Sequence, residues 1–406
     1  MYRILEGLRV VEVASFIAAP SGALYLRELG ADVIRIDPIG GGMDYGRWPL
    51  APNGRSLYWE GLNKGKRSVA IDLARPEGRE LASALVATPG ENAGLFVTNF
   101  PARGWLAHEA LAARRSDLIS VRVLGWADGR PAVDYTINAA TGYPMMTGPS
   151  GHDGPVNHVL PAWDLLTGAL AAANLLAAER RRRLTGAGAE IRLPLSDVAF
   201  STLARLGHVA EVTMNDADRP RSGNDLFGAF GRDFATSDGE RIMLIGLTAK
   251  QWTGVLEALE IAAPVAALER ELGADFTRDE GARFVHRARL GAIFAAAIGR
   301  RTLAALAPLL ERSGTTWSVY RTVKHALAAE PGLSTANPVF ELVAHPSGIR
   351  SLTPGAASSY AGETRAAVPP SPALGADTDA VLAECLGLSS QEIGRLHDAG
   401  IVAAAP

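Results

Sequence analysis

The sequence predicts an α/β protein: an open, Rossmann-like parallel sheet in a large domain, with a smaller α+β domain inserted into it. Three observations predict this fold. Short β-branched runs alternate with helical patterns over the first 125 residues. A mostly helical stretch at 250–329 is bracketed by two turn-rich segments, 215–240 and 330–338. The last residues are rich in proline and glycine and then become helical from Thr378. Alternating strands and helices favour parallel βαβ units with helices on both faces of the sheet.

The first half of the chain supplies the sheet. Strands are expected at 9–13, 33–36, 68–71, 94–98 and 118–123, where apolar β-branched runs are typical of buried strands. Helices are expected at 21–29, which Gly30 ends, and at 76–87, which Pro76 opens in its first turn. Ligands bind such sheets beyond the carboxyl ends of the strands. The loops to inspect are therefore 14–20, 37–42, 99–104 and the one after Val123.

Further elements complete the organisation. We expect a long helix at 162–184 ended by Gly186, a strand at 189–193 and a helix at 196–211, followed by a strand at 241–247. These elements place the large domain at 1–221, the small domain at 222–330 and a return to the large domain at 331–406.

Composition excludes several classes of protein. With 48% hydrophobic and 20% charged residues the chain is not disordered, and a net charge of −3 argues against a general nucleic-acid binder. One cysteine, Cys385, excludes an intrachain disulfide and a cysteine-based zinc site, and the histidines lack ligand spacing, so we expect no metal. The longest apolar stretch, 165–178, is shorter than the roughly 20 residues that span a bilayer. We expect a cytoplasmic protein without membrane contact, and the start of the sequence lacks the apolar core of a signal peptide.

Three features have two interpretations each. Gly40, Gly41 and Gly42 form either a mobile loop or a phosphate-binding loop. The basic run at 63–67 is either a solvated turn or an anion site, because clustered cations and turn amides suit phosphate groups. Asp164, at the front of the long helix, is either a helix-end residue that accepts hydrogen bonds from free N–H groups or a desolvated, reactive carboxylate nucleophile.

Taken together, these segments resemble the class III CoA-transferases, the CaiB/BaiF family. The resemblance covers nearly the whole chain and is carried by the order and spacing of blocks at 5–13, 29–37, 63–72, 76–78, 98–100, 183–186, 374–378 and 386–388. Longer blocks are most similar to a branch of the family that isomerises 2-methylfumaryl-CoA (mesaconyl-CoA). These blocks are 37–45, 47–49, 93–106, 157–164, 224–233 and 394–402.

The resemblance implies a mechanism. Asp164 matches the family's nucleophilic aspartate, which would attack the acyl-CoA thioester to give a mixed anhydride and then an aspartyl-CoA thioester. In the isomerising branch, CoA would move from carbon 1 to carbon 4 of one bound dicarboxylate. CoA is then part of the substrate, and no separate cofactor is expected.

The resemblance also implies binding residues. The positions that match CoA-binding loops, or that are cations near strand ends, are Phe16, Ile17, Ala18, Arg35, Arg75, Asn99, Phe100 and Arg103. Arg47 is expected to hold the second carboxylate of the substrate, because a guanidinium fits a carboxylate bidentately.

The chain departs from the family pattern at three places. Pro38 stands where many relatives carry a basic residue, and the glycine-rich lid is thinned at 223–231. The racemase branch has a histidine where this chain has Val133, followed by Asp134 and Tyr135. Without that histidine a two-base proton exchange lacks its second base, which disfavours a racemase.

Two other functions remain open: an intermolecular CoA transferase that acts between dicarboxylic acids, and a non-catalytic acyl-CoA binding protein. The family resemblance further implies a homodimer in which the two chains interlock, and a place in carbon fixation through the 3-hydroxypropionate bicycle or in a related route of acid assimilation.

Overall fold

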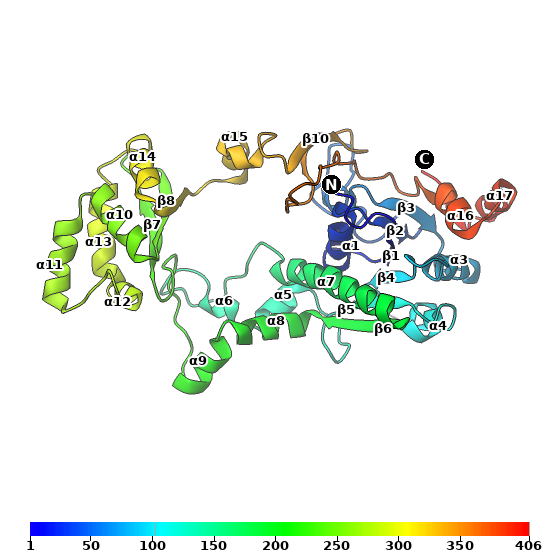
Figure 1. Ribbon diagram of the computed structural model, residues 1–406, viewed down its shortest axis with the longest axis horizontal. Helices are drawn as coiled ribbons and strands as arrows, with labels where there is room; N and C mark the ends of the chain where they lie inside the picture. The colour runs from blue at the N-terminus through cyan, green and yellow to red at the C-terminus, as the bar shows by residue number, and fades with distance from the viewer. Residues whose placement is uncertain (102, 406) are drawn as a thin grey trace. The chain divides into compact units, whose positions relative to one another are not determined.

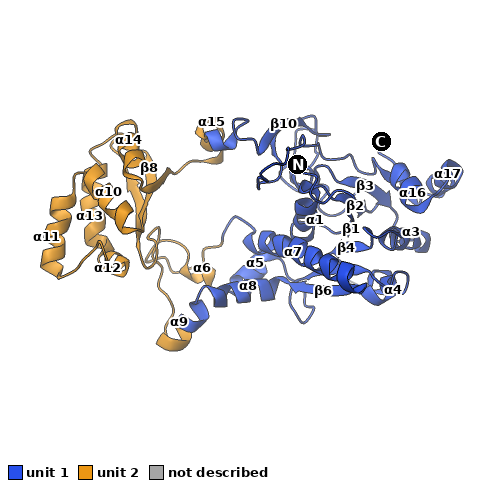
Figure 2. Ribbon diagram, in the orientation of Figure 1, with its two compact units in different colours: residues 1–141, 158–211, 331–406 blue, residues 142–157, 212–330 orange. Residues whose placement is uncertain are grey.

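The computed structural model describes residues 1–101 and 103–405, which divide into two compact units (Figure 2). The larger unit comprises residues 1–141, 158–211 and 331–406, and the smaller unit comprises 142–157 and 212–330. The expected boundaries at 222 and 330 lie close to these. However, the segment 142–157, which was expected in the large domain, belongs to the smaller unit. Its attachment is visible in Arg221, whose guanidinium donates hydrogen bonds to the carbonyl oxygens of Thr147 and Gly154.

The larger unit is built on a seven-stranded sheet with the order β12-β3-β2-β1-β4-β5-β6 (Figure 1). Strands β1 to β6 are parallel to their neighbours, and the short β12 runs antiparallel to β3. The strands are β1 (Arg9–Val13), β2 (Asp32–Asp37), β3 (Arg67–Ile71), β4 (Leu95–Thr98), β5 (Ile119–Leu124), β6 (Ala189–Pro194) and β12 (Val402–Ala403). The parallel sheet predicted from the alternating pattern is confirmed. Strand order reverses between β1 and β4, which is where sheets of this kind bind ligands.

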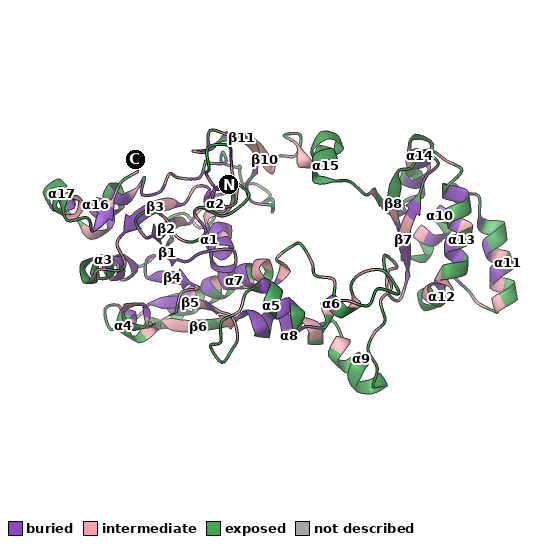
Figure 3. Cartoon of the chain, turned by 180° about the vertical axis from the view of Figure 1, so that it is seen from behind, coloured by how far each residue is buried: buried purple, intermediate pink, exposed green. Residues whose placement is uncertain are grey.

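Helices cover both faces of this sheet. Helices α3 (Pro76–Val86) and α16 (Thr378–Leu386) pack on the face that presents Val11, Ile36 and Phe96. Helices α1 (Ala18–Glu28) and α7 (Ala162–Thr185) pack against each other over the opposite face. The strands between these layers are largely buried (Figure 3). The long helix was predicted, and Gly186, at φ +71°, follows its last residue as expected.

Shorter elements complete the larger unit. The helices are α2 (Leu57–Asn63), α4 (His108–Ala112), α5 (Asp134–Ala139), α8 (Leu195–Arg205) and α17 (Ser390–Asp398), with 3₁₀ turns η1 (Gly104–Leu106) and η2 (Pro331–Leu333) and a hairpin of β10 (Phe340–Ala344) and β11 (Arg350–Pro354). The helix predicted at 196–211 is broken. Helix α8 ends at Arg205 and α9 (His208–Asn215) follows, because Gly207 lies between them at φ +83°.

The smaller unit contains an antiparallel sheet in the order β7-β8-β9, formed by β7 (Phe230–Ala235), β8 (Arg241–Gly246) and β9 (Thr316–Val319). Its helices are α6 (Tyr143–Met146), α10 (Ala249–Ala258), α11 (Ala262–Leu272), α12 (Glu280–Val285), α13 (Arg287–Ile298), α14 (Leu303–Ser313) and α15 (Val323–Ala329). An aromatic cluster of Phe230, Trp252, Phe276 and Phe294 forms its core. Among the residues described in both units, no helix combines the length and apolar character needed to cross a bilayer.

Candidate active site

Asp164 lies in the first turn of α7, but it does not cap the helix. Pro161 at the N-cap position provides no side-chain acceptor. The main-chain N–H groups of Trp163 and Asp164 instead donate to Oδ2 of Asp134, at 2.7 and 3.1 Å. No hydrogen bond to the Asp164 carboxylate is made by any of residues 1–101 and 103–405. Of the two interpretations of Asp164, the structure therefore rejects the helix-end acceptor and leaves its oxygens available to a ligand.

The electrostatic setting of Asp164 makes it a basic carboxylate. Burial, and then the negative charge of Asp134, raise the pKa of Asp164 to about 7, while the Arg47 guanidinium acts in the opposite direction. Raised basicity strengthens a carboxylate as a nucleophile once it is ionised. A partly buried carboxylate with a raised pKa, between the opposite charges of Asp134 and Arg47, is typical of a reactive site and not of an exposed surface aspartate.

Tyr58 belongs to the same cluster. Burial raises the pKa of its phenol above the ordinary value; Arg47 opposes this shift and Asp164 adds to it. Its hydroxyl is inaccessible to solvent and has no hydrogen-bond partner among the described residues. Because a buried hydroxyl without a partner costs free energy, this oxygen is a candidate to bond a substrate. Reasoning from the sequence missed Tyr58, since no spacing links it to Asp164.

Arg47 is exposed and has no ion-pair partner within residues 1–101 and 103–405. Its Cζ lies 5.2 Å from the centroid of the Phe16 ring and 5.5 Å from that of the Tyr58 ring. Its main chain is fixed, because its N–H donates to the carbonyl oxygen of Asp44 and its own carbonyl accepts the hydroxyl of Ser56. A positioned cation between two aromatic rings suits an anionic ligand.

The loop that follows β1 is held in a strained conformation beside the β4 loop. Phe16 has φ +65°, which is unusual for a residue with a side chain, and its N–H donates to Asp44 Oδ2 at 3.1 Å. Ser15 and Asn99 exchange two hydrogen bonds, of 3.1 and 2.7 Å. The structure thus brings the expected CoA-binding residues of the two loops, Phe16, Ile17, Ala18, Asn99 and Phe100, to the point where strand order reverses.

Two glycines bring this loop close to the start of α7. A Cβ atom on Gly168 would lie 2.1 Å from Ser21 Oγ and 2.7 Å from the carbonyl oxygen of Ala18. A Cβ on Gly22 would lie 2.8 Å from the carbonyl oxygen of Gly168. Only glycine permits this approach of α1 to α7. The contact sets the distance between the loop at 16–18 and Asp164, which lies one turn before Gly168.

Arg35 lies inside the fold rather than at the ligand site. Its side chain is 1% exposed and donates to Glu12, bidentately to Asp37, and to Asp44, at 2.8–3.2 Å. Three carboxylates occupy its donors, so this placement does not suit a contact with a CoA phosphate. We assign Arg35 a structural role instead, because through Asp44 it supports the main chain of Phe16.

The basic run at 63–67 is not an anion site. The Lys64 ammonium pairs with Glu28 at 2.9 Å and the Lys66 ammonium with Glu12 at 2.7 Å, and both side chains are buried. Lys66 also donates to the carbonyl oxygen of Pro20 and to Asn63. The solvated-turn interpretation is equally wrong for these two lysines. The phosphate role of the glycine run 40–42 stays a prediction.

The two remaining arginines expected to contact phosphate lie after parallel strands. Arg75 follows β3, is half-exposed, and donates to the carbonyl oxygen of Ala399 while pairing with Glu77 at 3.4 Å. Arg103 follows β4 and is exposed. Carboxyl ends of parallel strands meet at one edge of the sheet, so both side chains belong to the edge that carries the Phe16 loop.

Asp134 and His158 were not predicted as site residues. The sequence pointed to Asp134 only as the residue that follows Val133, where the racemase branch has a histidine. In the structure its Oδ1 lies 2.7 Å from His158 Nε2. The chain therefore places a histidine from a different segment beside Asp134, which holds the first turn of α7. Asp134 precedes Asp164 by thirty residues, so only the fold reveals the pairing.

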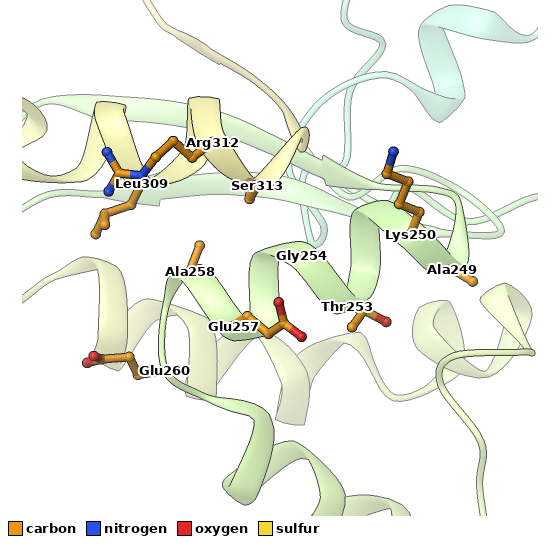
Figure 4. Close-up of a pocket in the computed structure, with 10 residues that line it drawn as sticks. All are labelled: Ala249, Lys250, Thr253, Gly254, Glu257, Ala258, Glu260, Leu309, Arg312 and Ser313. Carbon is orange, nitrogen blue, oxygen red and sulfur yellow. The ribbon is translucent and has the colours of Figure 1, made fainter.

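The smaller unit has an open depression of about 820 Å³ between α10 and α14 (Figure 4). Lys250, Glu257, Glu260 and Arg312 contribute charges of both signs to it. It contains none of the residues predicted for catalysis or CoA binding. No group of metal-ligating side chains occurs in the part of the chain that the structure describes.

Comparison with known proteins agrees with this geometry. Residues 5–378 match the sequence profile of CoA-transferase family III. The chain is 52% identical to 2-methylfumaryl-CoA isomerase of Chloroflexus aurantiacus over 405 residues, covering 99% of this chain and 98% of that protein. It is 30% identical to succinyl-CoA:mesaconate CoA-transferase of Haloarcula hispanica, over 70% of this chain and 72% of that one. A CaiB/BaiF family protein of Brucella suis has the same fold, with a TM-score of 0.76, 24% identity, and coverage of 95% and 100%. With a profile match over most of its length and a relative at 52% identity, the chain belongs to CoA-transferase family III.

Proposed function

We propose that this chain is an intramolecular CoA transferase that converts 2-methylfumaryl-CoA (mesaconyl-C1-CoA) into 3-methylfumaryl-CoA (mesaconyl-C4-CoA). The observation that carries the proposal is the 52% identity to 2-methylfumaryl-CoA isomerase over almost the whole of both chains. The free carboxylate of Asp164, with Arg47 and Tyr58 around it, supports the chemistry. The 3-hydroxypropionate bicycle is the proposed setting.

The reaction begins and ends with Asp164. Its carboxylate attacks the C1 thioester carbonyl, the C–S bond breaks, and CoA thiolate leaves behind a mixed anhydride. The thiolate then attacks the aspartyl carbonyl, which frees the C1 carboxylate and leaves CoA on Asp164 as a thioester. The C4 carboxylate attacks that thioester and expels the thiolate, which gives a second mixed anhydride between C4 and Asp164. The thiolate then attacks the C4 carbonyl of this anhydride, and the C–O bond to Asp164 breaks. Asp164 is regenerated as a carboxylate, so no oxidant, reductant or net proton is required.

Arg47 and Tyr58 are proposed to keep the dicarboxylate in place between these steps. The guanidinium would hold the carboxylate that is not reacting, and the Tyr58 hydroxyl would donate a hydrogen bond to a substrate oxygen. Recapture of a retained acid is effectively unimolecular, an advantage of up to about 7–11 kcal/mol when the groups are well oriented. Retention of the dicarboxylate would distinguish this isomerase from an intermolecular transferase, which releases its acid.

CoA itself is proposed to lie across the edge where β1 and β4 end. The loop residues Phe16, Ile17, Ala18, Asn99 and Phe100 would contact the pantetheine. Arg75 and Arg103 would bind phosphate groups, and Arg103 is the better placed because its side chain is free of ion pairs among the described residues. Replacement of Arg103 with Ala should raise KM for the acyl-CoA and leave kcat unchanged.

A homodimer with interlocked chains is also proposed. The family resemblance implies this assembly, and the match of residues 5–378 to CoA-transferase family III supports the resemblance. Apolar side chains exposed next to the site, Val159 at 93% and Leu160 at 58%, are consistent with a further protein surface there. Light scattering during size-exclusion chromatography should give twice the mass of one chain.

The test is to incubate the purified protein with mesaconyl-C1-CoA alone and to follow the regioisomers by chromatography. A parallel sample contains isotopically labelled free mesaconate. Formation of the C4 isomer without incorporation of label supports the isomerase. Turnover only after addition of another acid would identify an intermolecular transferase, the activity in the name of the Haloarcula relative.

Asp164→Asn is the decisive variant, and Asp398→Asn, which changes an exposed aspartate of the larger unit, is its matched control. The control should turn over normally while Asp164→Asn is inactive. If Asp164→Asn were as active as the wild type, Asp164 would not be the nucleophile. A protein that binds the ester but never turns it over would instead be an acyl-CoA binding protein.

A further inference from the structure

Both oxygens of the Asp134 carboxylate have hydrogen-bond partners. Its side chain is 2% exposed. Oδ2 accepts the N–H groups of Trp163 and Asp164, and Oδ1 lies 2.7 Å from Nε2 of His158. Asp134 therefore joins three segments: α5, on which it lies, the start of α7, and the stretch that precedes α7. The proposed mechanism uses neither Asp134 nor His158.

The His158 ring is held from two sides. Asp134 contacts its Nε2, and the ring of Tyr135 packs edge-to-face against it with centroids 5.8 Å apart. The Tyr135 hydroxyl donates to the carbonyl oxygen of Val159 at 3.3 Å, which ties down the adjoining backbone. The side chain is nevertheless 26% exposed, so it can exchange protons with solvent.

We propose that His158 is a positioning residue for Asp164 that acts through Asp134. Its hydrogen bond orients the Asp134 carboxylate so that the other oxygen holds the first turn of α7. The proposal rests on the proposed function, because it assigns a role within the same reaction.

The expected effect follows from this geometry. Asp134 acts on Asp164 in two ways: its Oδ2 accepts the N–H of Asp164, and its negative charge raises the pKa of the Asp164 carboxyl. Without His158, Oδ1 of Asp134 loses its partner, so the first turn of α7 and the Asp164 carboxylate are held less firmly. A misplaced nucleophile lowers kcat more than it weakens substrate binding.

Two variants test this role. His158→Gln keeps an N–H donor towards Asp134, whereas His158→Ala removes it. We expect His158→Ala to lower kcat by about 10- to 100-fold with KM changed less than about threefold. His158→Gln should recover most of the rate.

The control is a second pair with the same geometry. His397 Nε2 lies 2.7 Å from Asp379 Oδ1, between α17 and α16. His397→Ala should leave kcat unchanged. If His158→Gln were as slow as His158→Ala, the hydrogen bond to Asp134 would not be what positions Asp164, and the proposal would be refuted. If His158→Ala kept kcat within twofold, the positioning role would be refuted.

The wild type is measured in the same series with mesaconyl-C1-CoA. Absence of turnover by the wild type would contradict the proposed function, whereas the ratio of variant to wild type tests His158. Circular dichroism and melting temperature establish that each variant is folded. If His158→Ala does not fold, kcat of His158→Gln relative to the wild type decides the positioning role: recovery of most of the rate supports it, and a loss of about tenfold or more refutes it.

Discussion

Replacement of Arg35 by Met should lower the free energy of unfolding of the larger unit, with at most a small rise in KM for the acyl-CoA through the Phe16 loop that Asp44 supports. The guanidinium is 1% exposed and is shared by Glu12, Asp37 and Asp44, with a further hydrogen bond of 3.2 Å to the Asn63 side chain. Methionine fills a similar volume but provides no donor. Three carboxylates would then remain buried with the Lys66 ammonium, which pairs with Glu12, as the nearby cation.

The magnitude follows from this geometry. Removing one partner of a buried ion pair costs about 3–5 kcal/mol, because the other charge stays out of water without compensation. Burial already raises the pKa of Asp37, and Arg35 is the main group that opposes the shift. In the variant Asp37 would take up a proton more readily, which limits the loss. We therefore expect the free energy of unfolding to fall by about 3 kcal/mol, the lower end of that range.

The assay is urea unfolding followed by circular dichroism, together with KM for the acyl-CoA substrate. Arg103→Ala is the control, because its exposed side chain should change the free energy of unfolding by less than about 0.5 kcal/mol. A loss below about 1 kcal/mol for Arg35→Met, combined with a tenfold rise in KM, would refute this reasoning. That result would return Arg35 to the phosphate-binding role that its sequence position suggested.

Four further predictions concern the site. Asp164→Asn should lower turnover at least about a thousandfold, measured as formation of the C4 isomer, and a smaller loss would point to another nucleophile. Arg47→Ala should raise KM about tenfold or more, and an unchanged KM would remove its role in holding the carboxylate. Gly168→Ala should lower the free energy of unfolding, measured in urea, by about 1–3 kcal/mol and lower kcat, because the added Cβ would collide with Ser21. An unchanged unfolding curve would mean that α1 moves to accommodate the Cβ without cost. The pKa of Asp164, raised to about 7, means that folding favours the protonated acid, so this group contributes stability at low pH that is lost as pH rises from about 4 to 7. The stability of Asp164→Asn relative to the wild type should therefore increase as pH rises from about 4 to 7, while activity of the wild type falls below pH 7. A difference in the free energy of unfolding that is the same at all pH values would contradict the shift.

Local sequence patterns were sufficient to predict most helices and strands of the larger unit. The β-branched runs, Pro76 at the start of α3 and Gly186 after α7 predicted these elements close to their observed positions. They were less useful where tertiary contacts compete with local preference. Strand β7 (Phe230–Ala235) lies within a stretch rich in Asp and Gly that indicated a linker. It forms because Phe230 packs on Trp252 and Phe294, and because its backbone pairs with β8.

The site shows the same division. Residue type and block order already pointed to Asp164 as nucleophile, to Arg47 as a carboxylate partner and to the loops that follow β1 and β4. The ion pairs could not be predicted from the sequence. Arg35 and Lys66 look like unpaired cations until the fold places Glu12, from another strand, beside them. Asp134 likewise takes the helix-end role that the sequence left open for Asp164. Periodicity and turn chemistry act over a few residues and can be read along the chain. Burial and electrostatic pairing depend on residues that are distant in sequence, so the fold decides which charges are neutralised and which remain available to react.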